Sequence, residues 1–136
     1  MREIKFRGIS EDKEFIYHTQ WTFGSLVYNL DPTKEENEIR DAYIRTPLGF
    51  LSELIEIDPE TIGQYTGLTD KNGVEVLEGD ILKCDGLRIV IQYSGCAFEG
   101  RYLGPQKDLW SPIRNNNYLQ WVVIGNIHQN PELLKP

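Results

Sequence analysis

One stretch near the middle of the chain, residues 62–82, constrains the fold more than any other. It reads IGQYTGLTDKNGVEVLEGDIL and contains two places where the chain can reverse. Residues 70–73 (DKNG) are of types that tolerate positive φ, so they predict a sharp turn. A second break follows at residues 78–80 (EGD). The four residues between the breaks are too few for a helix and rich in strand formers, which predicts short β-strands joined by tight turns.

The residues of these two turns are expected to shape the backbone rather than to carry chemistry. Asp70, Asn72 and Gly73 are typical formers of the first turn. Gly79 and Asp80 belong to the second, where we expect the Asp80 carboxylate to accept backbone N–H groups and fix the entry into the next strand. The first turn superficially resembles a calcium loop, but it lacks the alternating acceptors and the distal Glu that such a loop requires.

Most of the remaining chain also has the patterns of strands. The clearest is residues 87–94, where Leu87, Ile89, Ile91 and Tyr93 alternate along one face. Short segments that alternate, or that are rich in aromatic and β-branched residues, predict the other strands. They are residues 2–7, 14–18, 22–28, 42–46, 53–57, 81–85, 96–103 and 120–124.

Four connecting segments depart from this pattern. Residues 31–38 are charged and predict a loop, with a short capped helix as the alternative. Residues 48–58 fit one face of a helix as well as a strand. Residues 104–117 hold two Pro and three consecutive Asn, which predicts a long loop. Residues 130–131 (NP) predict a single helical turn near the end of the chain.

The strand pattern predicts a mainly β fold of the β-rich α+β class. With 136 residues, the chain suits one domain or two small ones, and it needs no metal or disulfide to fold. The turn at residues 58–60 (DPE) predicts a boundary between an N-terminal β-rich subdomain, residues 1–58, and a C-terminal subdomain, residues 59–136. Five or six short strands after residue 60 suggest that the second is a small barrel.

Three motifs give the chain a resemblance to a known family. REIKFRG lies at residues 2–8, IGQYTGLTDKNG is followed by EGDI at the centre, and VIGNI is followed by NPELL near the end. Together they resemble the YopX family, small proteins encoded by phages and prophages. The resemblance implies a mainly β fold with an SH3-like barrel in the C-terminal half, and a phage context. It implies no particular activity.

The net charge of −7 is unevenly distributed along the chain. Residues 1–68 hold 7 basic and 13 acidic side chains, whereas residues 69–136 hold 7 and 8. The first half would repel a phosphate backbone. Nucleic-acid binding is therefore not favoured, and it would need the basic residues of the second half on one face, with Tyr93 or Trp110 for stacking. These basic residues are Lys83, Arg88, Arg101, Lys107 and Arg114.

The sequence holds no apolar run long enough for a membrane helix and no apolar h-region near its N-terminus. We therefore expect no membrane association, no signal peptide and a location in the cytoplasm. The resemblance implies that this is the cytoplasm of a bacterial host. In that compartment Cys84 and Cys96 are expected to be reduced core residues.

No pattern of a catalytic or metal site emerges. His18 and His128 lie near no Ser or Cys in a recognised catalytic motif. With Cys84 and Cys96 they match a zinc site in number, but the close ligand pairs of zinc motifs are missing. Phosphate-binding glycine loops are also missing. We expect no catalytic residue, no metal and no cofactor, and we favour a protein that is not an enzyme.

Trp110 is the strongest candidate for a contact residue, because tryptophans on exposed loops often carry interface energy. The alternative is that Trp110 covers the protein's own core. Gln64 and Tyr65 lie beside two glycines and are further candidates. The alternatives for the Tyr65 ring are packing and a place in a ligand groove, of which packing is favoured.

These features favour a non-catalytic protein that acts through protein–protein contacts. A β-rich fold leaves edge strands, and self-association is one way to cover them. We therefore expect a homo-oligomer, with a phage or host protein as a further partner. The alternatives are a nucleic-acid-binding module that uses the C-terminal barrel and, less favoured, an unrecognised small-molecule enzyme.

Overall fold

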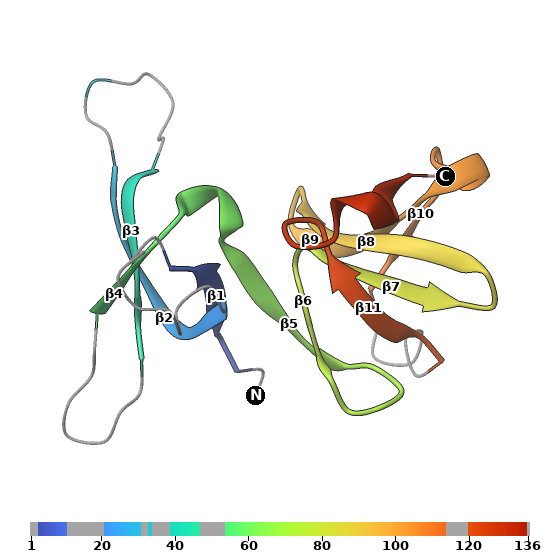
Figure 1. Ribbon diagram of the computed structural model, residues 1–136, viewed down its shortest axis with the longest axis horizontal. Helices are drawn as coiled ribbons and strands as arrows, with labels where there is room; N and C mark the ends of the chain where they lie inside the picture. Colours follow the sequence, from blue (N-terminus) through green and yellow to red (C-terminus); the bar gives the residue numbers. More distant parts are fainter. Residues whose placement is uncertain are drawn as a thin grey trace. The chain divides into compact units, whose positions relative to one another are not determined.

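The computed structural model describes residues 3–10, 21–30, 33, 39–46, 54–113 and 120–135. By their internal contacts the residues divide into two compact units, Glu3–Gln64 and Tyr65–Pro136. Each unit is built on antiparallel β-strands (Figure 1).

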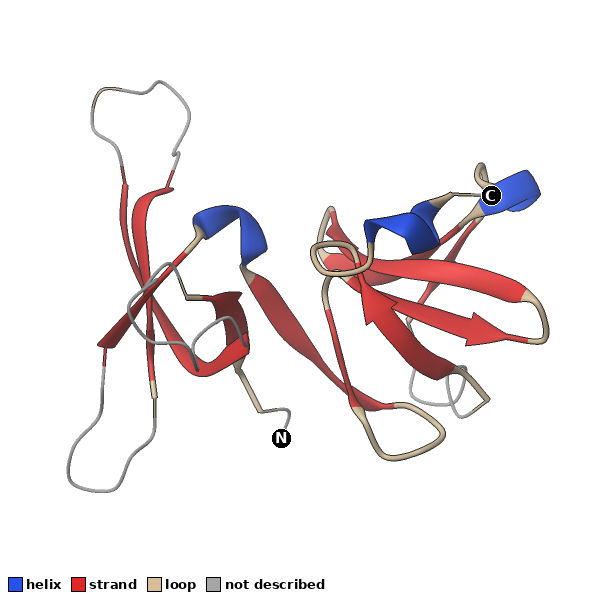
Figure 2. Cartoon of the chain, in the orientation of Figure 1, coloured by secondary structure: helices blue, strands red, loops and turns tan. Residues whose placement is uncertain are grey.

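The regular structure of the described residues is almost entirely β (Figure 2). The strands are β1 (Phe6–Ile9), β2 (Trp21–Leu30), β3 (Ile39–Arg45), β4 (Leu54–Ile57), β5 (Gly63–Thr69), β6 (Glu75–Leu77), β7 (Asp80–Cys84), β8 (Leu87–Ser94), β9 (Ala97–Tyr102), β10 (Trp110–Pro112) and β11 (Val122–Asn126). The helical elements are short 3-10 turns, η1 (Pro59–Thr61), η2 (Gly104–Gln106) and η3 (Pro131–Leu134).

The N-terminal unit contains the strand order β4-β3-β2-β1, with every neighbouring pair antiparallel. β2 belongs to two ladders in succession, because residues 21–24 pair with β1 and residues 25–30 pair with β3. Gly24, with a φ of +157°, lies where the partner changes. A Cβ atom at this position would clash with the carbonyl oxygen of Arg45, so the close approach of β2 and β3 requires glycine.

The core of this unit is a small apolar cluster on one face of the sheet. Ala42, Ile44 and Ile57 are fully buried, and Leu26 packs against them. The register explains the cluster, since Leu26 lies opposite Ile44 and Ala42 lies opposite Ile57, and directly opposed residues share a face.

The C-terminal unit contains a five-stranded antiparallel sheet in the order β10-β9-β8-β7-β11. Its core is formed by Val76, Leu82, Ile89 and Ile91. The alternation that predicts β8 is the cause, because Ile89 and Ile91 lie on one face of the strand and are both buried. β5 and β6 form an adjoining hairpin, paired at Tyr65 with Leu77 and at Thr69 with Glu75.

The mainly β prediction is confirmed. The strands predicted at residues 22–28, 42–46, 53–57, 81–85, 87–94 and 96–103 correspond to β2, β3, β4, β7, β8 and β9. No closed barrel is detected in the residues that the structure describes, so the SH3-like barrel stays a prediction. The division into domains at residue 58 also stays a prediction.

Other predictions lie outside the described residues or need correction. The strand at residues 14–18 lies outside them, as does the charged segment 31–38 apart from Thr33. The long loop at residues 104–117 is wrong in its first part, because this segment forms η2 and the strand β10. Its composition suggested a loop, but backbone pairing with β9 determines the structure.

Candidate interaction surface

Trp110 lies on an edge strand and not in a loop. It is the first residue of β10, directly opposite Arg101 of β9, and its side chain is 57% exposed. The turn η2 brings the chain back, since the Leu109 N–H donates to the Gln106 carbonyl at 2.8 Å and the Tyr102 N–H donates to the Leu109 carbonyl at 3.1 Å. Leu109 is itself 56% exposed. Two consecutive large apolar residues are therefore exposed at the edge of the sheet.

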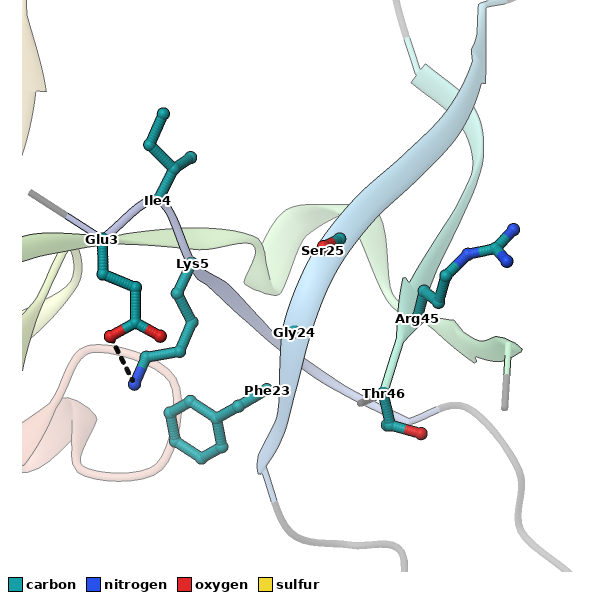
Figure 3. A pocket seen from close by; sticks show the side chains of 8 residues that line it. All are labelled: Glu3, Ile4, Lys5, Phe23, Gly24, Ser25, Arg45 and Thr46. Carbon is teal, nitrogen blue, oxygen red and sulfur yellow. Dashed lines mark ion pairs between the residues drawn. The ribbon is translucent and has the colours of Figure 1, made fainter. Parts of the chain in front are cut away.

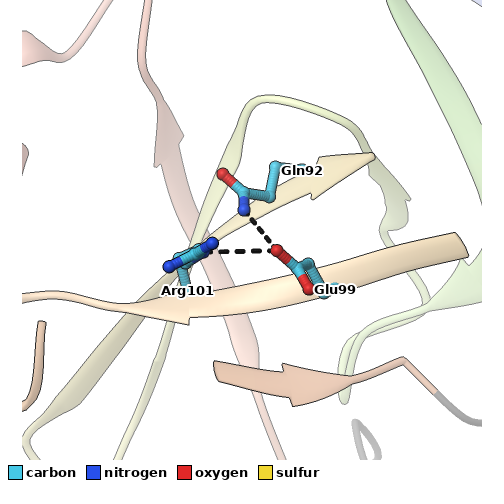
Figure 4. Close-up of polar contacts among 3 residues, drawn as sticks. All are labelled: Gln92, Glu99 and Arg101. Carbon is cyan, nitrogen blue, oxygen red and sulfur yellow. Dashed lines mark hydrogen bonds and ion pairs between the residues drawn. The ribbon is translucent and has the colours of Figure 1, made fainter. Parts of the chain in front are cut away.

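A polar cluster shares a sheet face with Trp110. Directly opposed residues of antiparallel strands have side chains on one face, so Trp110 and Arg101 share a face with Glu99, which is two residues away from Arg101. Figure 4 shows Gln92 and Arg101 both contacting the Glu99 carboxylate. Its Oε1 atom accepts hydrogen bonds from Gln92 Nε2 and, at 3.2 Å, from Arg101 Nε. We call Gln92, Glu99, Arg101 and Trp110 the Trp110 face.

The basic residues of the C-terminal unit are brought together only in part. The register places Lys83 opposite Arg88, and both share a face with Arg101. Arg88 Nη1 donates to the Leu133 carbonyl at 2.7 Å and Nη2 to the Lys135 carbonyl at 2.6 Å, so this side chain holds the C-terminal segment. Arg101 is paired with the Glu99 carboxylate.

The other two basic candidates lie elsewhere. Lys107 lies in the exposed turn after η2, and Arg114 lies outside the described residues. The face on which Lys83, Arg88 and Arg101 lie therefore has mixed charge.

Gln64 and Tyr65 are not part of the Trp110 face. They are consecutive residues of β5, so their side chains point to opposite sides of the strand. Gln64 is half-buried and lies opposite Phe6 of β1, whereas Tyr65 is buried and lies opposite Leu77 of β6. The burial of the Tyr65 ring leaves little of it for a partner.

The first predicted turn is organised by the buried carboxylate of Asp70. Its Oδ1 atom accepts the Asn72 N–H at 2.8 Å and the Val74 N–H at 2.9 Å. Its Oδ2 atom accepts the Val123 N–H at 2.9 Å, which links the β5–β6 turn to β11. Gly73 has a φ of +78°, a conformation that favours glycine.

The second predicted turn has a similar arrangement. Asp80 is buried at the start of β7, and its Oδ2 atom accepts the Leu77 N–H at 2.8 Å. Gly79 has a φ of +91°, and its N–H donates to the Ile91 carbonyl at 2.7 Å. Both carboxylates therefore accept backbone hydrogen bonds inside the C-terminal unit.

Gln64, Tyr65 and Asp80 line neither of two cavities found among the described residues. The first, of about 530 Å³, lies in the N-terminal unit between residues 3–5 and β2. It is lined by Glu3, Ile4, Lys5, Phe23, Gly24, Ser25, Arg45 and Thr46 (Figure 3). The sequence reasoning missed these residues, although a glycine inside a strand-like run at Gly24 is a signal of irregular pairing.

The second cavity, of about 430 Å³, lies in the C-terminal unit at the turn between β8 and β9. Tyr93 and Phe98 line it and stack edge to face, with their ring centroids 5.0 Å apart. Cys96 also lines it and is exposed, so the prediction that both cysteines are core residues is wrong for Cys96, which lies in the tight turn. Cys84 is half-buried, and both thiols are free.

The residues considered for catalysis or metal binding are only partly described. His18 lies outside the described residues, and His128 is half-buried with its backbone N–H on Asn126 Oδ1 at 3.1 Å. Within the described part of the chain, no three or more His, Cys, Asp or Glu residues gather in a way that could hold a metal ion.

None of the helices found among the described residues is long and apolar enough to span a membrane.

Comparison with known proteins places this fold. A crystal structure of protein EF1440 from Enterococcus faecalis is similar, with 28% sequence identity and a TM-score of 0.57 over 99% of this chain and 100% of that chain. No curated protein is significantly similar in sequence. The pattern of the YopX protein family matches residues 5–135, which is nearly the whole chain. The chain belongs to the YopX family.

Proposed function

We propose that this chain is a non-catalytic protein that acts through protein–protein contacts, including contacts with copies of itself. The observation that supports this most is Trp110, which is large, apolar and exposed on the edge strand β10. Tryptophan is among the residues that contribute most to binding energy at protein interfaces. An uncovered sheet edge also presents backbone groups that can pair with another chain. The setting that goes with this proposal is a phage or prophage product in the bacterial cytoplasm, as the YopX resemblance implies.

The Trp110 face is the proposed contact with a second, different protein. The test is affinity capture from lysates of the bacterial host, quantified by mass spectrometry, with native chain, Trp110→Ala and Leu134→Ala as baits. Leu134 is a matched control because it is also apolar and exposed, but lies on η3. We expect a protein that native chain and Leu134→Ala retain and Trp110→Ala loses. If no retained protein distinguishes Trp110→Ala from native chain, this contact is refuted.

Self-association is tested separately by the molar mass of the native chain in solution. A mass that rises above the 15.8 kDa of one chain with increasing concentration supports self-association. A single-chain mass at every concentration contradicts it.

Nucleic-acid binding is the alternative function, because Lys83, Arg88 and Arg101 share a sheet face with Trp110. It is less favoured because Arg88 is engaged by the C-terminal carbonyls and Arg101 by Glu99. Fluorescence anisotropy with labelled single-stranded DNA decides between the two. Binding that weakens steeply with salt would support the alternative, and no binding at low salt would exclude it.

A further inference from the structure

Among the described residues, the second half of β2 is an open sheet edge. Residues 21–24 of this strand pair with β1, and the β1–β2 ladder ends at the pair of Phe6 with Gly24. Residues 25–30 pair with β3 on one side, and no described residue pairs with them on the side that β1 occupied. The cavity of about 530 Å³ opens at this point, between Ser25 and the segment 3–5 that precedes β1 (Figure 3).

The shape of this site indicates what would fill it. Alternate residues of an edge strand direct their backbone N–H and C=O groups away from the sheet, where another strand can pair with them. The line of β1 continues along β2 past residues 25–29, where an extended segment of about five residues can pair. Such a segment would run antiparallel to β2, as β1 does.

The side chains of this edge gain from being covered. Tyr28 lies opposite Ala42 and therefore on the face of the buried core, yet its side chain is 50% exposed. Val27, on the opposite face, is 38% exposed. A strand added at this edge would therefore have an apolar side chain of β2 beside it on each face of the sheet.

Charge favours a second copy of this chain as the occupant. Each copy carries a net charge of −7, so two copies repel each other except where the surface is neutral or positive. Residues 25–30 (SLVYNL) carry no charge, and the cavity beside them is lined by one acidic side chain, Glu3, and two basic ones, Lys5 and Arg45. The described residues at this place therefore add no net negative charge that would oppose the approach of a second acidic chain.

Three of the other edge strands, β4, β10 and β11, are less suited to pairing with themselves. β4 carries the acidic residue Glu56, and β10 contains Pro112, which cannot donate a ladder hydrogen bond. The outer side of β11 is partly satisfied already, because the Val123 N–H donates to Asp70 and the Trp121 carbonyl accepts the Lys71 N–H at 3.0 Å.

We propose that two copies of this chain pair antiparallel through β2, with Val27 opposite Val27 of the second copy. This inference rests on the self-association proposed above and names its surface. A two-fold axis perpendicular to the sheet keeps the core faces of both copies on the same side of the joined sheet. Directly opposed residues share a face, so odd-numbered residues must lie opposite odd-numbered ones and even-numbered opposite even-numbered. Leu26 then lies opposite Tyr28 of the second copy, and Ser25 lies opposite its Asn29.

The test uses two charge variants of the central residue, Val27→Lys and Val27→Glu, and reads the molar mass by light scattering. Each variant alone places two like charges opposite each other, which we expect to weaken the dimer about tenfold or more. An equimolar mixture places Lys opposite Glu, so we expect the dimer mass to return. Leu54→Lys is the matched control, because Leu54 is an apolar, 50% exposed residue of the edge strand β4, and it should dimerise as the native chain does.

The outcomes separate this inference from the proposed function. If the native chain is a dimer and both Val27 variants dimerise equally well, the β2 surface is wrong while self-association stands. If the native chain is a monomer at every concentration, both are wrong.

Circular dichroism checks that the variants are folded. Should a variant unfold, hydrogen exchange of the native chain is decisive. The alternate amides of residues 25–29 that point away from β3 must exchange more slowly at high protein concentration than at low, and equal rates at these amides refute the pairing.

Discussion

Replacing Asp70 should destabilise the C-terminal unit strongly, since one buried carboxylate holds three backbone N–H groups. Hydrogen bonds to a charged group contribute about 1.5–3 kcal/mol each, and a buried donor left unsatisfied costs about 1–3 kcal/mol. Asn72 and Val74 lie in an exposed turn, so water can replace the carboxylate at their N–H groups. The half-buried Val123 N–H bears most of the loss.

From these contacts we expect Asp70→Ala to lower the free energy of unfolding by about 3–4 kcal/mol. That is a large fraction of the roughly 5–15 kcal/mol of a typical domain. Asp70→Asn should lose about 2 kcal/mol, because it keeps one acceptor but directs an amide donor at the Val123 N–H. The Asp70→Asn variant should therefore lie between Asp70→Ala and the native chain.

The assay is urea unfolding followed by tryptophan fluorescence and circular dichroism. Asp108→Ala is the control, because it removes an exposed carboxylate from the same unit and should change stability by less than about 0.5 kcal/mol. A loss below about 1 kcal/mol for Asp70→Ala would refute the role of this carboxylate in linking the turn to β11.

Three further predictions follow from single contacts. Gly24→Ala should destabilise the N-terminal unit by about 1–3 kcal/mol in thermal unfolding, since the new Cβ meets the Arg45 carbonyl oxygen at a positive φ; unchanged stability would contradict the close approach. Arg88→Ala should release the C-terminal segment and speed its proteolysis, whereas Lys83→Ala should not, and equal rates would show that the Arg88 hydrogen bonds do not hold it. Trp110→Ala should change unfolding free energy by less than about 1 kcal/mol, because the side chain is exposed; a loss of about 3 kcal/mol or more would indicate that it covers the core.

The sequence predicts elements whose structure depends on local patterns. Ile89 and Ile91 alternate with outward-facing residues, and this alone identifies β8 and its buried face. Asp70 and Gly73 have the turn chemistry that a reversal needs, so the β5–β6 turn is also predictable. In each case the information lies within a few consecutive residues.

Features that depend on distant partners could not be predicted in this way. β10 lies in a segment rich in Pro and Asn, and it becomes a strand only because Trp110 pairs with Arg101. The exchange of partners along β2 depends on where β1 ends and β3 begins, and the cavity at Ser25 exists only because of it. The pattern of a single sequence does not show which residues of two strands pair with each other. The open edge of β2 and its lack of charge could therefore not be identified from the sequence.

The molar mass of the native chain across a wide concentration range tests the central claim most directly, which is that this protein works by associating with other chains. Light scattering at physiological salt should give twice 15.8 kDa at the highest concentrations and decline toward 15.8 kDa on dilution. A mass of 15.8 kDa at every concentration would contradict self-association.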